Sequence, residues 1–215
     1  NKGVDLGTGK GSLDVDESLF FSLISRLEQR PDDEHFLAAL QENMGHFFTD
    51  VSLLENALCH RSYLNENPKA CPEDNERLEF LGDAVVGLCI GQLLMEKSPL
   101  KKEGELSKLR STLVSEPGLA RMARRIDLGR FIRLGKGERR SGGAEKNSIL
   151  SDAFEAVVAA VYLDSDFDTV YSLLSGLFAP VMDQVLAVEK IVDYKSMLQE
   201  KSQENGDKTV PVSGD

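Results

Sequence analysis

The sequence predicts an all-α fold, and two segments with helical periodicity support this prediction. At about 100° per residue, the apolar side chains of residues 75–88 share one helical face, which we expect to face a core: Leu78, Leu81, Val85 and Leu88. Residues 148–163 form the second segment, and small side chains on its flank would let a neighbouring helix approach closely: Ala153, Ala156, Ala159 and Ala160. A chain of 215 residues can hold one core and a small second module.

The opposite face of the first segment is acidic. Glu76, Glu79 and Asp83 lie within about a sixth of a turn of one another, and Glu79 and Asp83 form a like-charge pair that destabilises an isolated helix by about 0.2–0.5 kcal/mol. In the second segment Asp152 and Glu155 also share a face. If the two helices pack side by side, these acids converge and need a counter-charge, and carboxylate oxygens suit Mg²⁺ or Mn²⁺. The alternative is two amphipathic helices whose acids are simply solvated.

The residues themselves resemble a known family. The letters N-E-R-L-E-F-L-G-D-A of residues 75–84 match the ribonuclease III signature without interruption, and residues 148–163 resemble the second motif of that family. The resemblance implies a bacterial-type ribonuclease III endonuclease domain, which is a helical bundle. Position by position, it implies that four carboxylates bind the catalytic metal: Glu79, Asp83, Asp152 and Glu155. It also implies a pair of Mg²⁺ ions in each active site, with Mn²⁺ as a substitute and no other small-molecule cofactor.

The resemblance implies a reaction and an assembly as well. Such enzymes hydrolyse phosphodiester bonds of double-stranded RNA, leave 5′-phosphate and 3′-hydroxyl ends with short 3′ overhangs, and process rRNA and mRNA. They are homodimers, and Phe80 matches the residue that inserts into a cavity of the second subunit; the alternative is burial against a helix of the same chain. Glu76 and Glu103 match acids that assist the site, although Glu103 alone could be a favourable contact with a helix dipole.

Two other functions stay open. One is a non-cleaving ribonuclease III-like protein that binds RNA or a ribosomal partner, although such members usually lack one or more of the four carboxylates, which are all present here. The other is an all-helical interaction module without an RNA role. No apolar run approaches the roughly 18–20 residues that span a bilayer, so we expect no membrane association and a cytoplasmic location. Cys59, Cys71 and Cys89 lie apart without C-x-x-C spacing, which predicts reduced thiols.

Charge is distributed unevenly along the chain. The formal net charge is −11, yet residues 97–146 carry 14 Lys or Arg against 6 Asp or Glu, and the rest of the chain carries 11 against 30. A basic block in an acidic protein indicates a localised surface for phosphates, the alternative being ordinary solvated side chains. We expect RNA contacts from six cations of this block: Lys108, Arg110, Lys136, Arg139, Arg140 and Lys146. Residues 135–143 form a Gly-rich loop that resembles an RNA-facing or subunit-facing element.

The histidines are weak candidates for catalysis. His60 and Arg61 stand in the letters C-H-R-S-Y, where the family shows T-H-R-S-Y, and no nucleophile lies nearby in the sequence. We therefore expect both residues to form structural hydrogen bonds. His46 replaces a common aromatic residue of the family, and His35 lies outside the predicted core.

The other segments complete the predicted organisation. Residues 1–16 indicate a flexible leader or tag remnant, and residues 17–34 an extra N-terminal helix. Residues 35–187 correspond to the catalytic domain, with helices predicted over 37–48, 50–64, 101–115, 119–126 and 167–186 and a loop over 65–74. A linker at 188–192 precedes residues 193–215, which resemble the truncated start of an α+β double-stranded-RNA-binding domain, with a helix over 193–200 and a strand beginning at 209–211.

Overall fold

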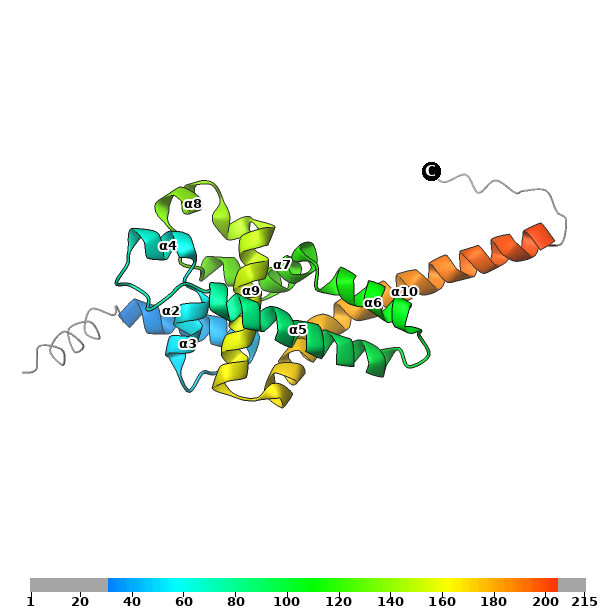
Figure 1. Cartoon of the computed structure of the whole chain (residues 1–215), viewed down its shortest axis with the longest axis horizontal. Helices are drawn as coiled ribbons and strands as arrows, with labels where there is room; N and C mark the ends of the chain where they lie inside the picture. The colour runs from blue at the N-terminus through cyan, green and yellow to red at the C-terminus, as the bar shows by residue number, and fades with distance from the viewer. Residues whose placement is uncertain (1–30, 205–215) are drawn as a thin grey trace, which may run out of the picture. The chain divides into compact units, whose positions relative to one another are not determined.

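The computed structural model describes residues 31–204, and the regular elements in this range are helices (Figure 1). In chain order they are α2 (Pro31–Met44), α3 (Val51–Ala57), α4 (Arg61–Glu66), α5 (Glu76–Lys97), α6 (Glu103–Leu113), α7 (Glu116–Arg125), η1 (Leu128–Arg130), α8 (Lys136–Arg140), η2 (Gly143–Glu145), α9 (Asn147–Asp164) and α10 (Phe167–Glu204). No β-strand occurs in this range, and one isolated bridge pairs Cys59 with Arg133. The all-α prediction is confirmed. The predicted leader, the helix expected from residue 17 to residue 30 and the strand at 209–211 lie outside the described residues.

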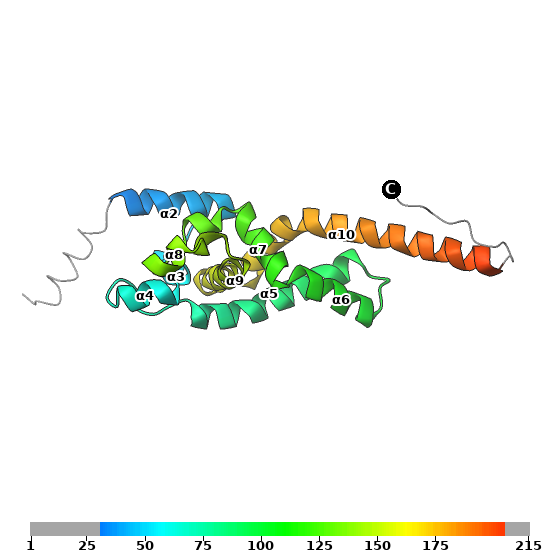
Figure 2. The same ribbon diagram turned by 90° about the horizontal axis from the view of Figure 1, so that it is seen from above.

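The chain divides into two compact units, Asn1–Ala39 and Leu40–Asp215, and the core lies in the second. This core is built around α9, whose side chains are buried along most of its length, including the whole Ala-rich flank. Helices α5, α7 and α3 pack against α9, and Figure 2 shows α9 end-on beside α5. Burial of apolar side chains on all sides of α9 is the main stabilising contribution here.

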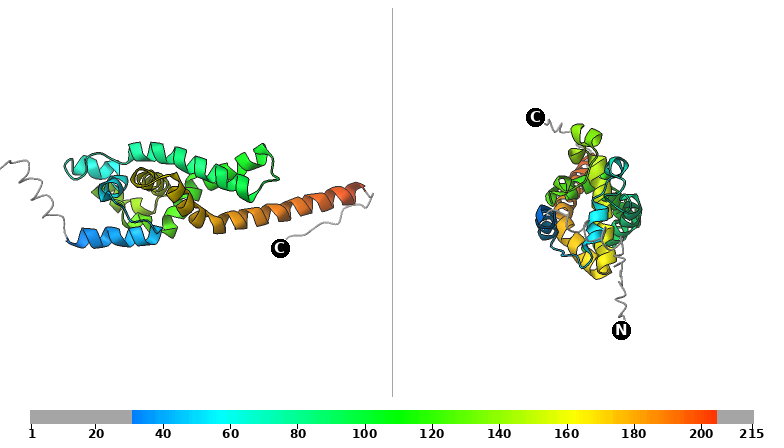
Figure 3. Two further views of the ribbon diagram at one scale, coloured as in Figure 1. Left: turned by 90° about the horizontal axis from the view of Figure 1, so that it is seen from below. Right: turned by 90° about the vertical axis from the view of Figure 1, so that its left-hand side faces the viewer.

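The buried face of α5 differs from the predicted one. Gly82, Val86, Cys89 and Leu93 lie at its centre, whereas Leu88 is 60% exposed. At about 100° per residue, Leu88 falls roughly a third of a turn away from that centre. The prediction that Leu88 faces the core is therefore wrong, because α5 packs on α9 through the face that carries Gly82. Helix α6 lies beside the second half of α5 (Figure 3).

Three predicted segments differ in their secondary structure. The helix expected over 50–64 is two helices, because the backbone at Leu58 and His60 hydrogen-bonds with Arg133 (Arg133 N–H to Leu58 O, 2.8 Å; His60 N–H to Arg133 O, 3.2 Å) and leaves the helical path. The loop expected over 135–143 contains α8. Helix α10 runs through the residues of the predicted linker, 188–192, and continues to Glu204, with Pro180 inside it.

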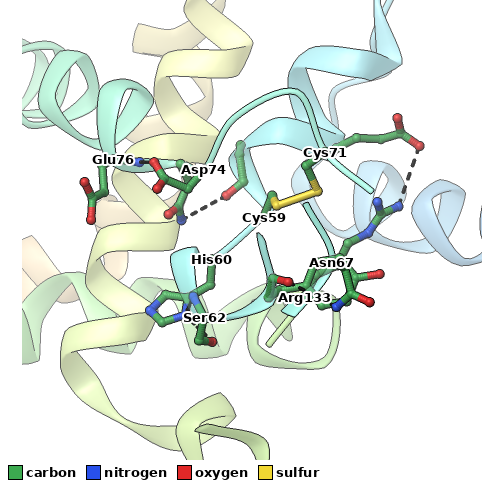
Figure 4. The surroundings of a disulfide bond; sticks show 12 residues. Cys59, His60, Ser62, Asn67, Cys71, Asp74, Glu76 and Arg133 are labelled. Atoms are coloured by element: carbon green, nitrogen blue, oxygen red, sulfur yellow. Dashed lines mark hydrogen bonds and ion pairs between the residues drawn. A yellow bond between two sulfur atoms is a disulfide. The ribbon is translucent and has the colours of Figure 1, made fainter. Parts of the chain in front are cut away.

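A disulfide joins Cys59 to Cys71, so the expectation of reduced thiols is wrong for this pair (Figure 4). The two α-carbons are 6.6 Å apart, although 12 residues separate them along the chain. They meet because the N–H of Asn75 donates to the carbonyl of Cys59 at 2.9 Å and folds the intervening loop back. Cys89 is a free, buried thiol, and burial raises its pKa to about 11.

Asp164 ties the end of α9 to the turn before α3. Its carboxylate accepts the N–H groups of Thr49 (3.0 Å) and Asp50 (2.8 Å) and lies 3.1 Å from Nε2 of His46. Burial raises the pKa of Asp164, but these hydrogen bonds outweigh burial and hold the pKa below its ordinary value. His46 therefore has a structural role in the turn.

Two helices of the described range are long and apolar enough to span a membrane when judged by length and composition alone, Glu76–Lys97 and Phe167–Leu186. No such run was expected from the sequence. Core helices also pass that test, and the side chains of both helices supply buried core residues, such as Val86 and Ile90 in α5 and Leu174 and Phe178 in α10. We therefore assign both helices to the core.

Candidate metal centre

The candidate acids lie within the first three turns of α5 and α9. Helix α5 begins after Asn75, which is buried and donates through its side-chain amide to the carbonyl of Ala57 at 3.2 Å. Asp74 accepts the N–H of Glu76 at 3.3 Å. At the start of α9, the guanidinium of Arg124 donates to the side-chain oxygen of Asn147 at 2.8 Å. These contacts fix the position at which each helix begins, and with it the direction of the acids one and two turns later.

Gly82 brings the two helices into contact at the level of the acids. A Cβ atom at residue 82 would lie 1.9 Å from the backbone oxygen of Glu155, far inside any real contact distance. Only glycine permits this approach of backbones. Because Glu79 and Asp83 flank Gly82 on α5, the approach places α5 acids beside α9 acids. Gly82 was not among the predicted site residues, although a glycine within a helix signature is a recognisable signal of close packing.

Three of the four predicted metal ligands converge. Carboxylate oxygens of Glu79, Asp152 and Glu155 lie within 4.8 Å of one another, and each residue is half-buried. Asp83 is exposed and is outside this group. Its charge nevertheless raises the pKa values of Glu155 and Glu79, so it lies at the edge of the cluster. The structure thus brings together acids that are about 70 residues apart in the sequence.

The electrostatics of this cluster favour a bound cation. Burial, followed by the charges of Asp83, Glu79 and Asp152, raises the pKa of Glu155 to about 8. Burial and then Asp152 and Glu76 raise the pKa of Glu79 as well. Burial raises the pKa of Asp152 despite a hydrogen bond from Ser151. Carboxylates that are costly to ionise together are stabilised by a divalent cation, and an all-oxygen donor set fits Mg²⁺ or Mn²⁺.

The two assisting acids lie in different places. Glu76 forms an ion pair with Arg61 at 3.1 Å and lines a cavity of about 250 Å³ with Glu79 and Asp152. Glu103 starts α6, accepts a hydrogen bond from Ser107 at 2.8 Å and lines a groove of about 970 Å³ between α5 and α6. The structure therefore brings Glu76 to the cluster but places Glu103 in the groove.

Phe80 is 83% exposed on α5. No helix of residues 31–204 therefore buries Phe80, which was the alternative to a partner contact. Leu88 and Met95, which are 60% and 66% exposed, follow Phe80 along α5, and both line the groove beside α6. This apolar face remains uncovered within the described residues.

The predicted RNA-binding cations differ in their surroundings. Lys108 and Arg110 are exposed on α6, and Arg110 lines the groove. On α8, Lys136 and Arg140 are exposed, and Arg139 donates to the carbonyl of Leu134 at 3.4 Å. Lys146, at the start of α9, is held by Glu138 and by Ser141. The ammonium of Lys146 is thus engaged within the protein.

Comparisons with known proteins agree with this architecture. A family model described as ribonuclease-III-like matches residues 50–180. The chain is 46% identical over 168 residues to ribonuclease 3 of Bacillus cytotoxicus, a match that covers 78% of this chain and 68% of the relative. It is 47% identical over 166 residues to ribonuclease 3 of Bacillus cereus, with 77% and 67% covered.

A solved structure is similar as well. The nuclease domain of ribonuclease III from Campylobacter jejuni superposes with a TM-score of 0.60 at 42% identity, covering 65% of this chain and 93% of that one. That structure was described for flexibility in a region involved in dimer formation. The two proteins are therefore similar in sequence as well as in fold.

Proposed function

Because the chain belongs to the ribonuclease III family, we propose that it is an endoribonuclease that hydrolyses double-stranded RNA at the carboxylates of α5 and α9. The products would be 5′-phosphate and 3′-hydroxyl ends with short 3′ overhangs. The observation that carries the proposal is the convergence of Glu79, Asp152 and Glu155 within 4.8 Å. Acids that are simply solvated have no reason to converge or to be half-buried. These three come from two different helices, and each is half-buried.

The metal ligands in this proposal are Glu79, Asp83, Asp152 and Glu155. When bound there, a pair of divalent ions, Mg²⁺ or its substitute Mn²⁺, supplies a water activated for attack on phosphorus and neutralises charge on the leaving oxygen. Glu155 holds a proton at neutral pH in the metal-free protein, since its pKa is raised to about 8, and releases it when a cation binds. Asp83 completes the set from its exposed position on the next turn of α5. Glu76 is held at the edge by Arg61.

The substrate in this proposal is recognised by shape. A duplex of RNA hides its base edges in a deep, narrow groove, so contacts fall on phosphates and 2′-hydroxyls. The exposed cations of α6 and α8 suit such contacts, because Lys and Arg side chains can bind phosphates without reading base edges. We place the enzyme in the cytoplasm, acting on rRNA and mRNA precursors.

The assembly in this proposal is a homodimer. Phe80, Leu88 and Met95 form an exposed apolar face on α5, and water contact makes such a face unfavourable unless a partner covers it. We infer that Phe80 inserts into a second copy. We also propose that Glu103 assists the metal site from the groove next to this face.

The domain limits also stay a proposal. We assign residues 35–187 to the nuclease domain and residues 193–215 to the beginning of a double-stranded-RNA-binding domain. The second half of α10, up to Glu204, would then carry the first helix of that domain. Limited proteolysis followed by mass spectrometry tests this division.

The test of function is incubation of the purified chain with a long RNA duplex, with Mg²⁺ or with EDTA. The proposal predicts short duplex products with Mg²⁺ and none with EDTA. Glu155→Gln should bind the duplex and leave it intact. A wild-type chain that binds the duplex without cutting it would instead show a non-cleaving member of the family, and a chain that neither binds nor cuts would show an interaction module.

A further inference from the structure

The cavity beside the acid cluster has an unusual lining. It holds about 250 Å³, and Glu76, Glu79 and Asp152 contribute three carboxylates to its wall. His60 lines the same cavity from the segment before α4. Two of these acids belong to the cluster that is proposed to bind metal, so any phosphate held at the metals would lie next to this cavity. Carboxylates offer no donor to such a phosphate, so a donor has to come from the other lining residues, which are His60, Arg61, Ser62, Asn65 and Asn75.

A hydrogen-bond chain fixes the proton on the His60 ring. The backbone N–H of Ser62 donates to Nδ1 of His60 at 3.2 Å, as a cap of α4. The hydroxyl of Ser62 also lies 2.7 Å from Nδ1, and it accepts the N–H of Gly135 at 2.9 Å. This leaves the hydroxyl proton free to donate to Nδ1, which already accepts the N–H of Ser62. With two donors directed at it, Nδ1 is an acceptor, and the ring proton is on Nε2.

The Nε2–H group of His60 has no hydrogen-bond partner within the described residues. Of the other donors that line the cavity, Asn65 is exposed, and two are engaged within the protein. Arg61 pairs with Glu76 at 3.1 Å, and the side-chain amide of Asn75 donates to Ala57 at 3.2 Å. Figure 4 shows the His60 ring directed away from the disulfide, with Ser62 beside it. The Nε2 side of the His60 ring therefore lines the cavity without a hydrogen-bond partner among the described residues.

We propose that His60 is a substrate-binding residue, whose Nε2–H donates a hydrogen bond to a non-bridging phosphate oxygen of the RNA duplex beside the cleaved bond. This inference rests on the proposed function. The protein positions the donor before RNA arrives, because Ser62 and Gly135 fix both the ring orientation and the tautomer. His60 also forms the structural hydrogen bonds predicted from the sequence, through Nδ1 to Ser62.

The first test needs no cleavage. Long-range ¹H–¹⁵N correlation spectra of the ¹⁵N-histidine-labelled Glu155→Gln chain report which ring nitrogen of His60 carries the proton. The proposal predicts the Nε2–H tautomer, and a shift of the Nε2 resonance when an RNA duplex is added. Protonation at Nδ1, or a resonance that does not move when the duplex binds, would overturn it.

The second test separates substrate binding from capping. His60→Ser keeps a side-chain oxygen that caps α4 but cannot reach the cavity. Its melting temperature and its affinity for Mn²⁺ should equal those of the wild type, while KM for the duplex should rise about 10- to 100-fold, as expected when a hydrogen bond to a charged group is removed. His60→Gln, which restores a neutral donor of greater length, should recover part of this loss.

The outcomes of these tests distinguish the proposed contact between His60 and RNA from the proposed ribonuclease activity. Unchanged duplex kinetics in a folded His60→Ser chain would overturn the contact and leave the proposed function intact. A loss of Mn²⁺ affinity would place the donor on Asp152 instead of on RNA and would also overturn it. If the wild-type chain does not cut, the proposed function fails, and the contact fails with it.

Discussion

Gly82 of α5 and Glu155 of α9 meet backbone to backbone. A Cβ at residue 82 would lie 1.9 Å from the carbonyl oxygen of Glu155 and 2.4 Å from its carbonyl carbon. This contact sets the spacing of the two helices at the height of the acid cluster. The position of the candidate metal centre therefore depends on the absence of one methyl group.

Gly82→Ala should damage both stability and the site. The new methyl group meets backbone, which cannot move aside as a flexible side chain can, so the free energy of unfolding should fall by about 1–3 kcal/mol. Mn²⁺ affinity should fall with it, because α5 and α9 are forced apart. Gly176→Ala is the matched control: nothing lies within 4 Å of a Cβ there, and the change should stabilise α10 slightly. Chemical denaturation and calorimetry measure both. Equal effects of the two substitutions would contradict the account.

The stability of the metal-free chain should fall as the pH rises through the neutral range. The unfolded Glu155 carboxyl loses its proton near its ordinary pKa of 4.5, whereas the folded one keeps it until about pH 8. Between these values the folded state holds more protons, so the free energy of unfolding decreases with pH. Denaturation in EDTA at several pH values should show this decline.

Glu155→Gln is the control for that decline. The variant lacks the titrating group, so its stability should vary less with pH over the same range, and saturating Mg²⁺ should flatten the decline in the wild type. Identical pH profiles for the wild type and Glu155→Gln in EDTA would show that Glu155 ionises normally and that the acids do not form one cluster.

Phe80→Glu should yield a folded monomer. The side chain is 83% exposed in the single chain, so a charge costs little within one copy but is unfavourable in an apolar cavity of a second copy. Phe47→Glu is the matched control, since Phe47 is 65% exposed, does not belong to α5 and does not line the groove. Sedimentation velocity decides between these outcomes. A Phe80→Glu chain that still dimerises would remove Phe80 from the interface.

Neutralising Lys136 and Arg140 together should flatten the salt dependence of duplex binding. Both side chains are exposed, so each can bind a phosphate, and the slope of log K against log salt should fall by about 1 for each phosphate that the variant no longer neutralises. Lys146→Gln should change the slope less, because Glu138 holds that ammonium. Titrations with Glu155→Gln at several salt concentrations measure the slopes. No change in the double variant would place the duplex on another surface.

Helical periodicity and letter matches predicted much of this molecule. The helices at 76–97 and 147–164, the shared faces of their acids and the close packing along the Ala-rich flank all follow from local spacing, which a helix preserves. The convergence of Glu79 with Asp152 and Glu155 was expected only on the condition that these helices pack together.

The remainder depends on contacts between distant residues. The interruption at Leu58 to His60 comes from pairing with Arg133, and no local signal marks it. The Cys59–Cys71 disulfide depends on how Asn75 folds the loop back. The exposure of Leu88 depends on which face of α5 meets α9, which Gly82 decides. Spacing fixes which residues share a face, but the packing partner determines which face is buried.

Anomalous diffraction from a crystal soaked in Mn²⁺ reports whether acids of α5 and α9 share divalent ions. We expect anomalous density within about 2.0–2.6 Å of carboxylate oxygens of Glu79, Asp152 and Glu155. The same soak of Glu155→Gln crystals should weaken or remove that density. A fully soaked wild-type crystal with no anomalous density between α5 and α9 would contradict this expectation.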